Sequence, residues 1–292
     1  MISLTNLFLF ILIFFNHSIL LYSKVNTTID HAITVFVHGT FPARKLLQYS
    51  PGRSLIYFPK GLSLAENISK KYHFHQVAKG CIDLSPDLYS FDQFYIFGWK
   101  SEHVYDHVRA EAANDLIYAL QKIVDDYYQL HQIVPKVRLI GFSHGGNVVL
   151  HTANALPLIV QSKTIEVEVW IFGTPVQQVN QHLINSNNFS KVYSIYSKND
   201  WIQRMDPQGL RNPQIRKKHF WSDRIFSSES NCIQIEFTVN QKSIGHTSYR
   251  SVFKYFPIIQ KLVLEKTQDI KTGFIAVDLK RRFNSEVQHS VS

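Results

Sequence analysis

Apolar positions along this chain fall into short runs of strand length, separated by stretches in which apolar residues recur every three or four positions. Short runs that are rich in Val and Ile and bounded by turn residues predict buried β-strands. Six segments have this character: residues 33–41, 93–99, 136–142, 165–175, 192–197 and 233–239. We therefore expect six strands.

Helical spacing is clearest after residue 104. Steps of three and four predict a long amphipathic helix whose apolar face consists of Val108, Ala112, Leu116, Leu120, Ile123, Tyr127 and Leu130. The sequence "GGNVVLHTANAL" predicts a second helix that ends before Pro157, and "YFPIIQKLVLEK" predicts a last one. The sequence "SLAE", residues 63–66, has capping-box spacing and predicts the start of a short helix.

Strands that alternate with helices indicate an α/β fold, in which a mostly parallel sheet is covered by helices on both faces. The chain has 292 residues and contains neither an internal repeat nor a linker rich in Pro, Gly and Ser. We therefore expect one main domain, residues 31–265. Residues 266–292 form an extension, of which the part 271–283 either adds a strand or docks elsewhere; the pattern assigns it no role.

The N-terminus begins with an unbroken apolar run, residues 7–15, of the length found in the core of a secretory signal. No Lys or Arg precedes it, and "LYSK" is a poor cleavage site because it lacks small residues. We expect residues 1–23 to be a signal peptide or an uncleaved membrane anchor. A buried N-terminal helix is the alternative. The protein is accordingly expected to be exported, secreted or periplasmic, or membrane-anchored.

The chain is basic, with 31 Lys and Arg against 22 Asp and Glu and a formal net charge of +9. Such a balance favours anionic lipid, acidic polymer or nucleic acid as a partner, although it also suits a basic soluble protein without one. No zinc-finger, RNA-recognition or helix-turn-helix pattern is present, so we expect no nucleic-acid partner. The two cysteines, Cys81 and Cys232, could pair in an exported protein, and the sequence leaves this open.

Chemically active residue types stand just after the predicted strands. Ligands of open α/β sheets bind at the carboxyl ends of the strands, so these turns are the first place to look for a site. Ser143 follows the strand 136–142, Asp200 follows 192–197, and His246 comes a short loop after 233–239. A serine hydroxyl is a weak nucleophile until a hydrogen-bonded base takes its proton, and the base needs a carboxylate to hold its tautomer. These three residues are therefore candidates for nucleophile, base and acid.

The segment "GFSHGG", residues 141–146, fits a nucleophile held on a sharp strand-to-helix turn. Such a turn is crowded on both sides, so Gly141 and Gly145 would let the two elements approach each other. The helix that follows directs positive dipole and backbone N–H groups at the reaction centre. We expect the N–H of His144 to stabilise an oxyanion, with a second N–H from Thr40 in the turn after the first strand.

These motifs resemble the α/β-hydrolase superfamily on its lipase and esterase side, over roughly residues 33–264. "GFSHGG" is similar to the nucleophile elbow, "FVHGTF" to the oxyanion loop, "YSKNDWIQ" to the acid loop and "SIGHTSY" to the loop of the catalytic histidine. "FGTP" resembles a turn common in lipases, although Val176 stands where many of them have His. The resemblance implies an α/β-hydrolase fold and ester hydrolysis through an acyl-enzyme, with no metal or organic cofactor.

Several alternatives stay open. Ser143 could be a simple helix cap, and Asp206 or Asp223 could serve as the acid in place of Asp200. The same fold could carry a thioesterase, an acyltransferase, a peptidase or a binding protein without activity. The sequence predicts neither the acyl length and head group of the substrate nor the oligomeric state.

Metal sites receive little support from the sequence. His103 and His107 are four apart on a predicted helix, but Val104 stands where a zinc peptidase has its glutamate. His73 and His75 would share a strand face without a third ligand. Surface histidines explain both pairs, and we expect no metal site.

Two excursions, residues 42–61 and 204–232, could cover the site. The second is basic and aromatic, which suits binding to an anionic lipid surface or an anionic substrate. A solvated loop without a partner could have the same composition. Its residues and those just before it include Trp201, Arg204, Leu210, Arg211, Arg216, Lys217, Lys218, Phe220, Trp221, Arg224 and Ile225.

Overall fold

All six predicted strands are present in the computed structural model, which describes residues 32–40, 60–103, 105–211, 214 and 216–280. The predicted leader, residues 1–23, lies outside this range, as does nearly all of the first excursion. The six strands are β1 (Ala32–Val37), β3 (Phe94–Gly98), β4 (Lys136–Phe142), β7 (Val167–Phe172), β8 (Lys191–Tyr196) and β9 (Ile233–Val239).

Three further strands join these six, so that the described residues form a nine-stranded sheet in the order β10-β9-β8-β7-β4-β1-β3-β2, with β11 paired to β9. The added strands are β2 (Gly61–Leu64), β10 (Lys242–Ser243) and β11 (Gly273–Leu279). Pairing is parallel except where β2 meets β3 and β10 meets β9. A separate hairpin joins β5 (Ile159–Val160) to β6 (Lys163–Thr164).

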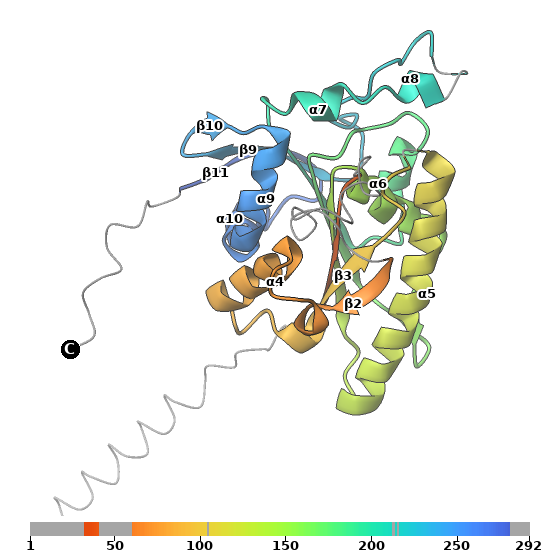
Figure 1. The fold of residues 1–292 in the computed structure, drawn as a ribbon, viewed down its shortest axis with the longest axis vertical. Coiled ribbons are helices and arrows are strands. Elements are labelled where there is room, and N and C mark those ends of the chain that lie inside the picture. Colours follow the sequence, from red (N-terminus) through yellow and green to blue (C-terminus); the bar gives the residue numbers. More distant parts are fainter. Residues whose placement is uncertain (1–31, 41–59, 104, 212–213, 215, 281–292) are drawn as a thin grey trace, which may run out of the picture. The chain divides into compact units, whose positions relative to one another are not determined.

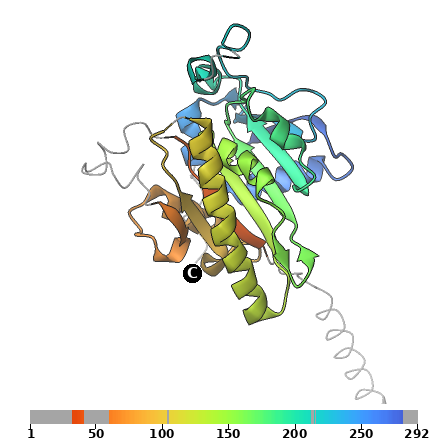
Figure 2. The ribbon, with the colours of Figure 1, turned by 90° about the vertical axis from the view of Figure 1, so that its right-hand side faces the viewer.

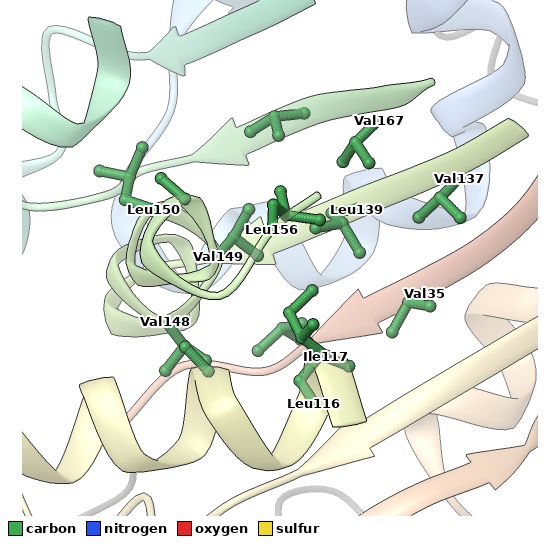
Figure 3. Close-up of a cluster of buried hydrophobic side chains, with 14 of the residues drawn as sticks. Val35, Leu116, Ile117, Val137, Leu139, Val148, Val149, Leu150, Leu156 and Val167 are labelled. Atoms are coloured by element: carbon green, nitrogen blue, oxygen red, sulfur yellow. The ribbon is translucent and has the colours of Figure 1, made fainter. Parts of the chain in front are cut away.

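Helices cover both faces of the sheet, α5 (Asp106–His131) and α6 (His144–His151) on one side and α4 (His73–Leu84), α9 (Tyr249–Val252) and α10 (Phe256–Lys266) on the other (Figure 1). Figure 2 shows α5 running along its face of the sheet. Alternate strand residues serve the two cores: Val35 and Leu139 pack under α5 and α6, whereas Phe36 and Ile140 pack under α4 and α10. Figure 3 shows the first of these cores. The predicted α/β-hydrolase fold, with a mostly parallel sheet and helices on both faces, is confirmed by this arrangement.

The long helix was predicted correctly and the short capping-box helix was not. In α5 the buried positions include Val108, Ala112, Leu116 and Leu120, although Leu130 at its end is exposed. Residues 63–64 belong instead to β2, which leads into the 3-10 turn Ala65–Asn67 without a side-chain cap, because the antiparallel pairing of β2 with β3 takes Ser63 into the sheet. Further 3-10 turns are Phe91–Gln93, Thr152–Asn154, Gln181–Asn185, His246–Ser248 and Phe253–Tyr255.

Both histidine pairs differ from their predicted setting. His103 precedes α5, which begins at Asp106, so His103 and His107 do not share a helix face. His73 and His75 lie in the first turn of α4 and not on a strand. Within the described residues, no group of three or more His, Cys, Asp or Glu side chains could hold a metal ion.

Cys81 and Cys232 are free and buried. Cys81 belongs to the core under α4, and Cys232 to the core on the opposite face of the sheet. The sheet therefore keeps the two thiols apart. Burial raises the pKa of the Cys232 thiol to about 12.

Beyond β8 the chain forms α7 (Trp201–Arg204) and α8 (Gln208–Arg211), which lie at one end of the domain in Figures 1 and 2. The C-terminal extension contributes β11, which lies parallel to β9. Of the two alternatives for residues 271–283, an added strand or docking elsewhere, the structure shows the added strand. Nowhere in the described part of the chain is a helix both long enough and apolar enough to span a membrane.

Candidate active site

Ser143 sits at the junction of β4 and α6 in a strained backbone conformation, with φ 53° and ψ −131°. Non-glycine residues seldom adopt positive φ, and such a conformation costs about 1–3 kcal/mol, so it persists only where the surroundings impose it. The N–H of Ser143 donates to the carbonyl of Phe172 at 2.9 Å, and its carbonyl accepts from the N–H of Gly146 at 2.9 Å. This is the backbone geometry that the predicted nucleophile elbow requires.

Glycine is needed on both sides of this turn. A Cβ on Gly145 would collide with the backbone of Val37 and His38 at the end of β1. A Cβ on Gly141 would lie 2.5 Å from the Cα of Gly146. Gly141 therefore lets β4 and α6 approach each other, as predicted, whereas Gly145 makes room for the end of β1.

The turn after β1 lies against the candidate nucleophile, since a Cβ on Gly39 would come 2.8 Å from the Cβ of Ser143. His38 Nδ1 donates to the carbonyl of Gly39 at 2.8 Å, and Trp99 Nε1 donates to the carbonyl of His38 at 2.8 Å. In a trans peptide the N–H points opposite to the C=O. By holding the Gly39 carbonyl, His38 therefore fixes the direction of the Thr40 N–H, a role that the sequence alone did not indicate.

His246 and Asp200 form a hydrogen-bonded pair, with Nδ1 of the imidazole 2.8 Å from Oδ2 of the carboxylate. A carboxylate oxygen accepts, so Nδ1 carries a proton, and in the neutral imidazole this tautomer leaves the lone pair on Nε2. The other carboxylate oxygen, Oδ1, accepts from the N–H of Gln203 at 2.9 Å, because Asp200 caps the amino end of α7. Asp200 is fully buried.

The loop of His246 is tied to the turn of Asp200 by two more hydrogen bonds. The N–H of Ile244 donates to Ser197 Oγ at 2.8 Å, and Asn199 Nδ2 donates to the carbonyl of Ser243 at 3.2 Å. The imidazole stacks on the ring of Phe142, the residue before Ser143, at a centroid distance of 4.9 Å. The structure thus brings His246 to Asp200 and to the residue beside Ser143.

Tyr249 lies fully buried beside this pair, with its ring centroid 6.4 Å from that of His246. Burial, together with the negative charge of Asp200, raises the pKa of the Tyr249 hydroxyl well above its usual range. The phenol therefore stays neutral and adds no second negative charge next to the carboxylate.

The two alternative acids lie elsewhere. Asp223 is exposed, and its backbone pairs with that of Val176. Asp206 is buried and lies 3.2 Å from Nε2 of His144, not beside His246. The geometry therefore favours Asp200 as the partner of His246, and the catalytic role of each residue stays a prediction.

Behind the elbow lies a buried polar network that the sequence did not reveal. Arg109 of α5, only 1% exposed, donates through Nη2 to Gln177 Oε1 at 2.6 Å and to Asp106 Oδ1 at 3.1 Å. Asp106 Oδ1 also accepts from His151 Nε2 at 2.9 Å. A buried guanidinium without such partners would cost several kcal/mol, so these contacts are what allow the charge of Arg109 to be buried.

The network predicts a pH-dependent stability. Burial alone would raise the pKa of Asp106, but the hydrogen bond and charge of His151 and the charge of Arg109 hold it at about 2. A depressed carboxyl pKa stabilises the fold above the unfolded-state pKa near 4, and this stabilisation is lost as the pH falls toward 2.

We therefore expect Asp106→Asn to lower the free energy of unfolding by about 1–2 kcal/mol at pH 7, allowing for partial exposure of the carboxylate. The difference from wild type should shrink between pH 5 and pH 3, because the unfolded chain binds a proton at Asp106 near pH 4 whereas the folded protein does so only near pH 2. Urea unfolding across this range measures it. A gap of the same size at pH 7 and pH 3 would contradict the assignment.

No protein-family pattern matches this chain, and no curated protein matches its sequence. Solved structures that resemble it include MGS-M1, an α/β hydrolase from a deep-sea metagenome library of the Medee basin (12% identity, 89% of this chain and 72% of that chain covered, TM-score 0.33). A lipase/esterase of Lactobacillus plantarum matches with 12% identity, 88% and 83% coverage and a TM-score of 0.34. The carboxylesterase Cest-2923 of the same organism matches with 15% identity, 89% and 74% coverage and a TM-score of 0.34. Similarity this low carries no information about the site of this chain.

Proposed function

We propose that this protein is a serine hydrolase that cleaves carboxylic esters, as a lipase or carboxylesterase does. The observation that carries the proposal is the hydrogen-bonded pair of His246 and Asp200 next to a serine held in a strained elbow conformation. A core packing role would require neither the strain at Ser143 nor a buried carboxylate that fixes the tautomer of a histidine.

In the proposed reaction, Ser143 Oγ attacks the acyl carbon while Nε2 of His246 takes its proton. The carbonyl oxygen becomes an oxyanion, which the N–H groups of His144 and Thr40 stabilise. His246 then gives the proton to the departing alcohol, which leaves an acyl-enzyme on Ser143. Water then gives a proton to the same imidazole and adds to the acyl carbon; the bond between the acyl carbon and Ser143 Oγ breaks, Oγ takes the proton back from His246, and the acid is released. These steps need no metal or organic cofactor.

The first test is labelling of the purified protein with a fluorophosphonate probe, followed by assays on oxygen esters, thioesters and peptides. We expect labelling and a preference for oxygen esters. A preference for thioesters or peptides would replace this assignment with one of the other acyl-transfer activities. A folded protein that neither labels nor hydrolyses any of these substrates would indicate a binding protein.

We further propose that the segment 201–225 binds an anionic membrane surface from which the substrate is taken. Support comes from large apolar side chains that face solvent on this segment, with Trp201 60%, Met205 61% and Leu210 61% exposed. Exposed cations stand among them at Arg204, Arg216, Lys217 and Lys218. Since Asp200 immediately precedes α7, a membrane bound here would lie next to the site. Aromatic side chains inserted at an interface and cations above anionic head groups are the two contributions such binding requires.

Replacing Arg216, Lys217 and Lys218 together by Gln should weaken binding to anionic vesicles roughly 100-fold, at about 1 kcal/mol per cation. Binding to zwitterionic vesicles should change little. The control is a triple change to Gln at Lys70, Lys122 and Lys261, which are exposed elsewhere on the domain. Cosedimentation with vesicles measures both. Equal losses in the two triple variants would show a general charge effect and would exclude this segment as the binding surface.

A further inference from the structure

The side chain of His144, the first residue of α6, is buried, and it joins three structural elements. Its Nε2 lies 3.2 Å from Asp206 Oδ1, which belongs to the segment between α7 and α8. Its Nδ1 lies 3.4 Å from Arg109 Nη1 of α5 and 3.3 Å from Asn147 Nδ2 of α6. The residue that follows Ser143 therefore has a second structural role besides its backbone N–H.

The neighbours of this imidazole define its tautomer. Guanidinium and amide nitrogens only donate, so Nδ1 of His144 must accept from both. The amide of Asn147 is itself oriented, since its Oδ1 accepts from Asn180 Nδ2 at 2.9 Å and its Nδ2 donates to the carbonyl of Pro175 at 3.1 Å. The proton of His144 is consequently on Nε2, which donates to Asp206.

Four side chains close into a ring through these contacts. Asp206 Oδ2 accepts from Gln177 Nε2 at 2.6 Å, and Gln177 Oε1 accepts from Arg109 Nη2 at 2.6 Å. Arg109 Nη1 then returns to His144 Nδ1. Ser222 Oγ adds a bond of 2.7 Å to Asp206 Oδ2. All four ring members are at most 9% exposed, and the charges of Arg109 and Asp206 compensate each other within the ring.

A buried polar ring has one preferred arrangement, because every displaced member leaves donors or acceptors unsatisfied. This ring includes the side chain of the first residue of α6, whose backbone N–H is proposed to bind the oxyanion. The direction of that N–H follows the first turn of the helix, so a shift of the imidazole would misdirect the donor. Displacements of about 1 Å are enough to lose much of such stabilisation.

We propose that Asp206, acting through the His144 imidazole, is a positioning residue that aligns the His144 N–H with the oxyanion. This inference rests on the proposed hydrolase function. Neither side chain carries a proton in the reaction; the pair sets backbone geometry. Asp206 and Ser222 belong to the segment proposed to bind the membrane. The position of that segment on the domain is therefore coupled to the alignment of the oxyanion donor.

The test compares Asp206→Asn and His144→Gln with the control Asp223→Asn, an exposed aspartate of the same segment. The first two should lower kcat roughly 10- to 100-fold with KM nearly unchanged, because the oxyanion forms only in the transition state. A boronic acid forms a negatively charged tetrahedral adduct with a serine, which resembles the proposed intermediate. Its affinity should therefore fall in parallel with kcat. The control should match wild type. A merely structural role would lower thermal stability without this selective loss.

Two further variants keep the test decisive. Ser222→Ala removes a single bond to Asp206 and should lower kcat a few-fold even if the stronger variants fold poorly. His144→Gln and Asp206→Asn alter the same contact, so the loss in the double variant should be smaller than the product of the single losses. Wild-type kcat and boronate affinity in folded Asp206→Asn and Ser222→Ala would overturn the inference. Failure of the wild type to label or hydrolyse would overturn the proposed function instead.

Discussion

Ser143→Ala is expected to abolish fluorophosphonate labelling and to lower kcat for ester hydrolysis by a factor on the order of 10⁴ or more. The loss is this large because the acyl-enzyme route needs an oxygen at this position, and neither His246 nor the oxyanion donors can replace it. The fold should survive, since alanine removes one atom from a side chain that is 8% exposed.

The matched control is Ser251→Ala, an exposed serine of α9 that lies on the side of the sheet where His246 packs. It should label and hydrolyse like wild type. Mass spectrometry of the labelled wild type adds an independent check, because the adduct should sit on the peptide that contains Ser143. An adduct on a different serine would refute the nucleophile assignment.

Asp200→Asn is expected to lower kcat by roughly 10³- to 10⁴-fold while the protein stays folded. The reason lies in the second partner of the carboxylate. The N–H of Gln203 donates to Oδ1, so an asparagine would keep its carbonyl oxygen there and turn its NH₂ group toward His246. Nδ1 of His246 would then have to accept, which moves the ring proton to Nε2, the atom that must take the proton of Ser143.

Circular dichroism and urea unfolding should show that this variant remains folded, and Asp223→Asn again serves as the control. Labelling by fluorophosphonate should slow along with hydrolysis, because both reactions need the same base. An Asp200→Asn variant within tenfold of wild type would mean that another acid supports His246.

The strands, and the positions of Ser143, Asp200 and His246 in the turns that follow them, were predictable because their signals are local. An apolar run followed by Gly-x-Ser-x-Gly-Gly specifies both a strand end and a close approach of backbones, and the strained φ of Ser143 agrees with it. The capping-box prediction failed for a non-local reason. Ser63 pairs with Ile96 across β2 and β3, and sheet pairing of this kind leaves no trace in a four-residue window.

The sequence favoured Asp200 because it directly follows a predicted strand, but it left Asp206 and Asp223 open, since all three lie within one stretch that shows no apolar period. The decisive facts are spatial: Asp200 caps α7 and faces His246, and Asp206 turns the other way to His144. The ring behind the elbow was hidden for a similar reason. Charged residues are expected on the exposed face of an amphipathic helix, so Arg109 looks ordinary in the sequence of α5. Only its burial in the structure distinguishes it.

The pairing of β11 with β9 has a consequence for how the chain is made. β9 leads into the loop of His246, yet its parallel partner is the last element of the described chain to leave the ribosome. Until then β9 presents open N–H and C=O groups along Ile233–Val239, a row that can pair with another chain. Synthesis from N- to C-terminus therefore leaves the edge next to the proposed base unprotected until the end, and trimming the chain before Gly273 would make that exposure permanent.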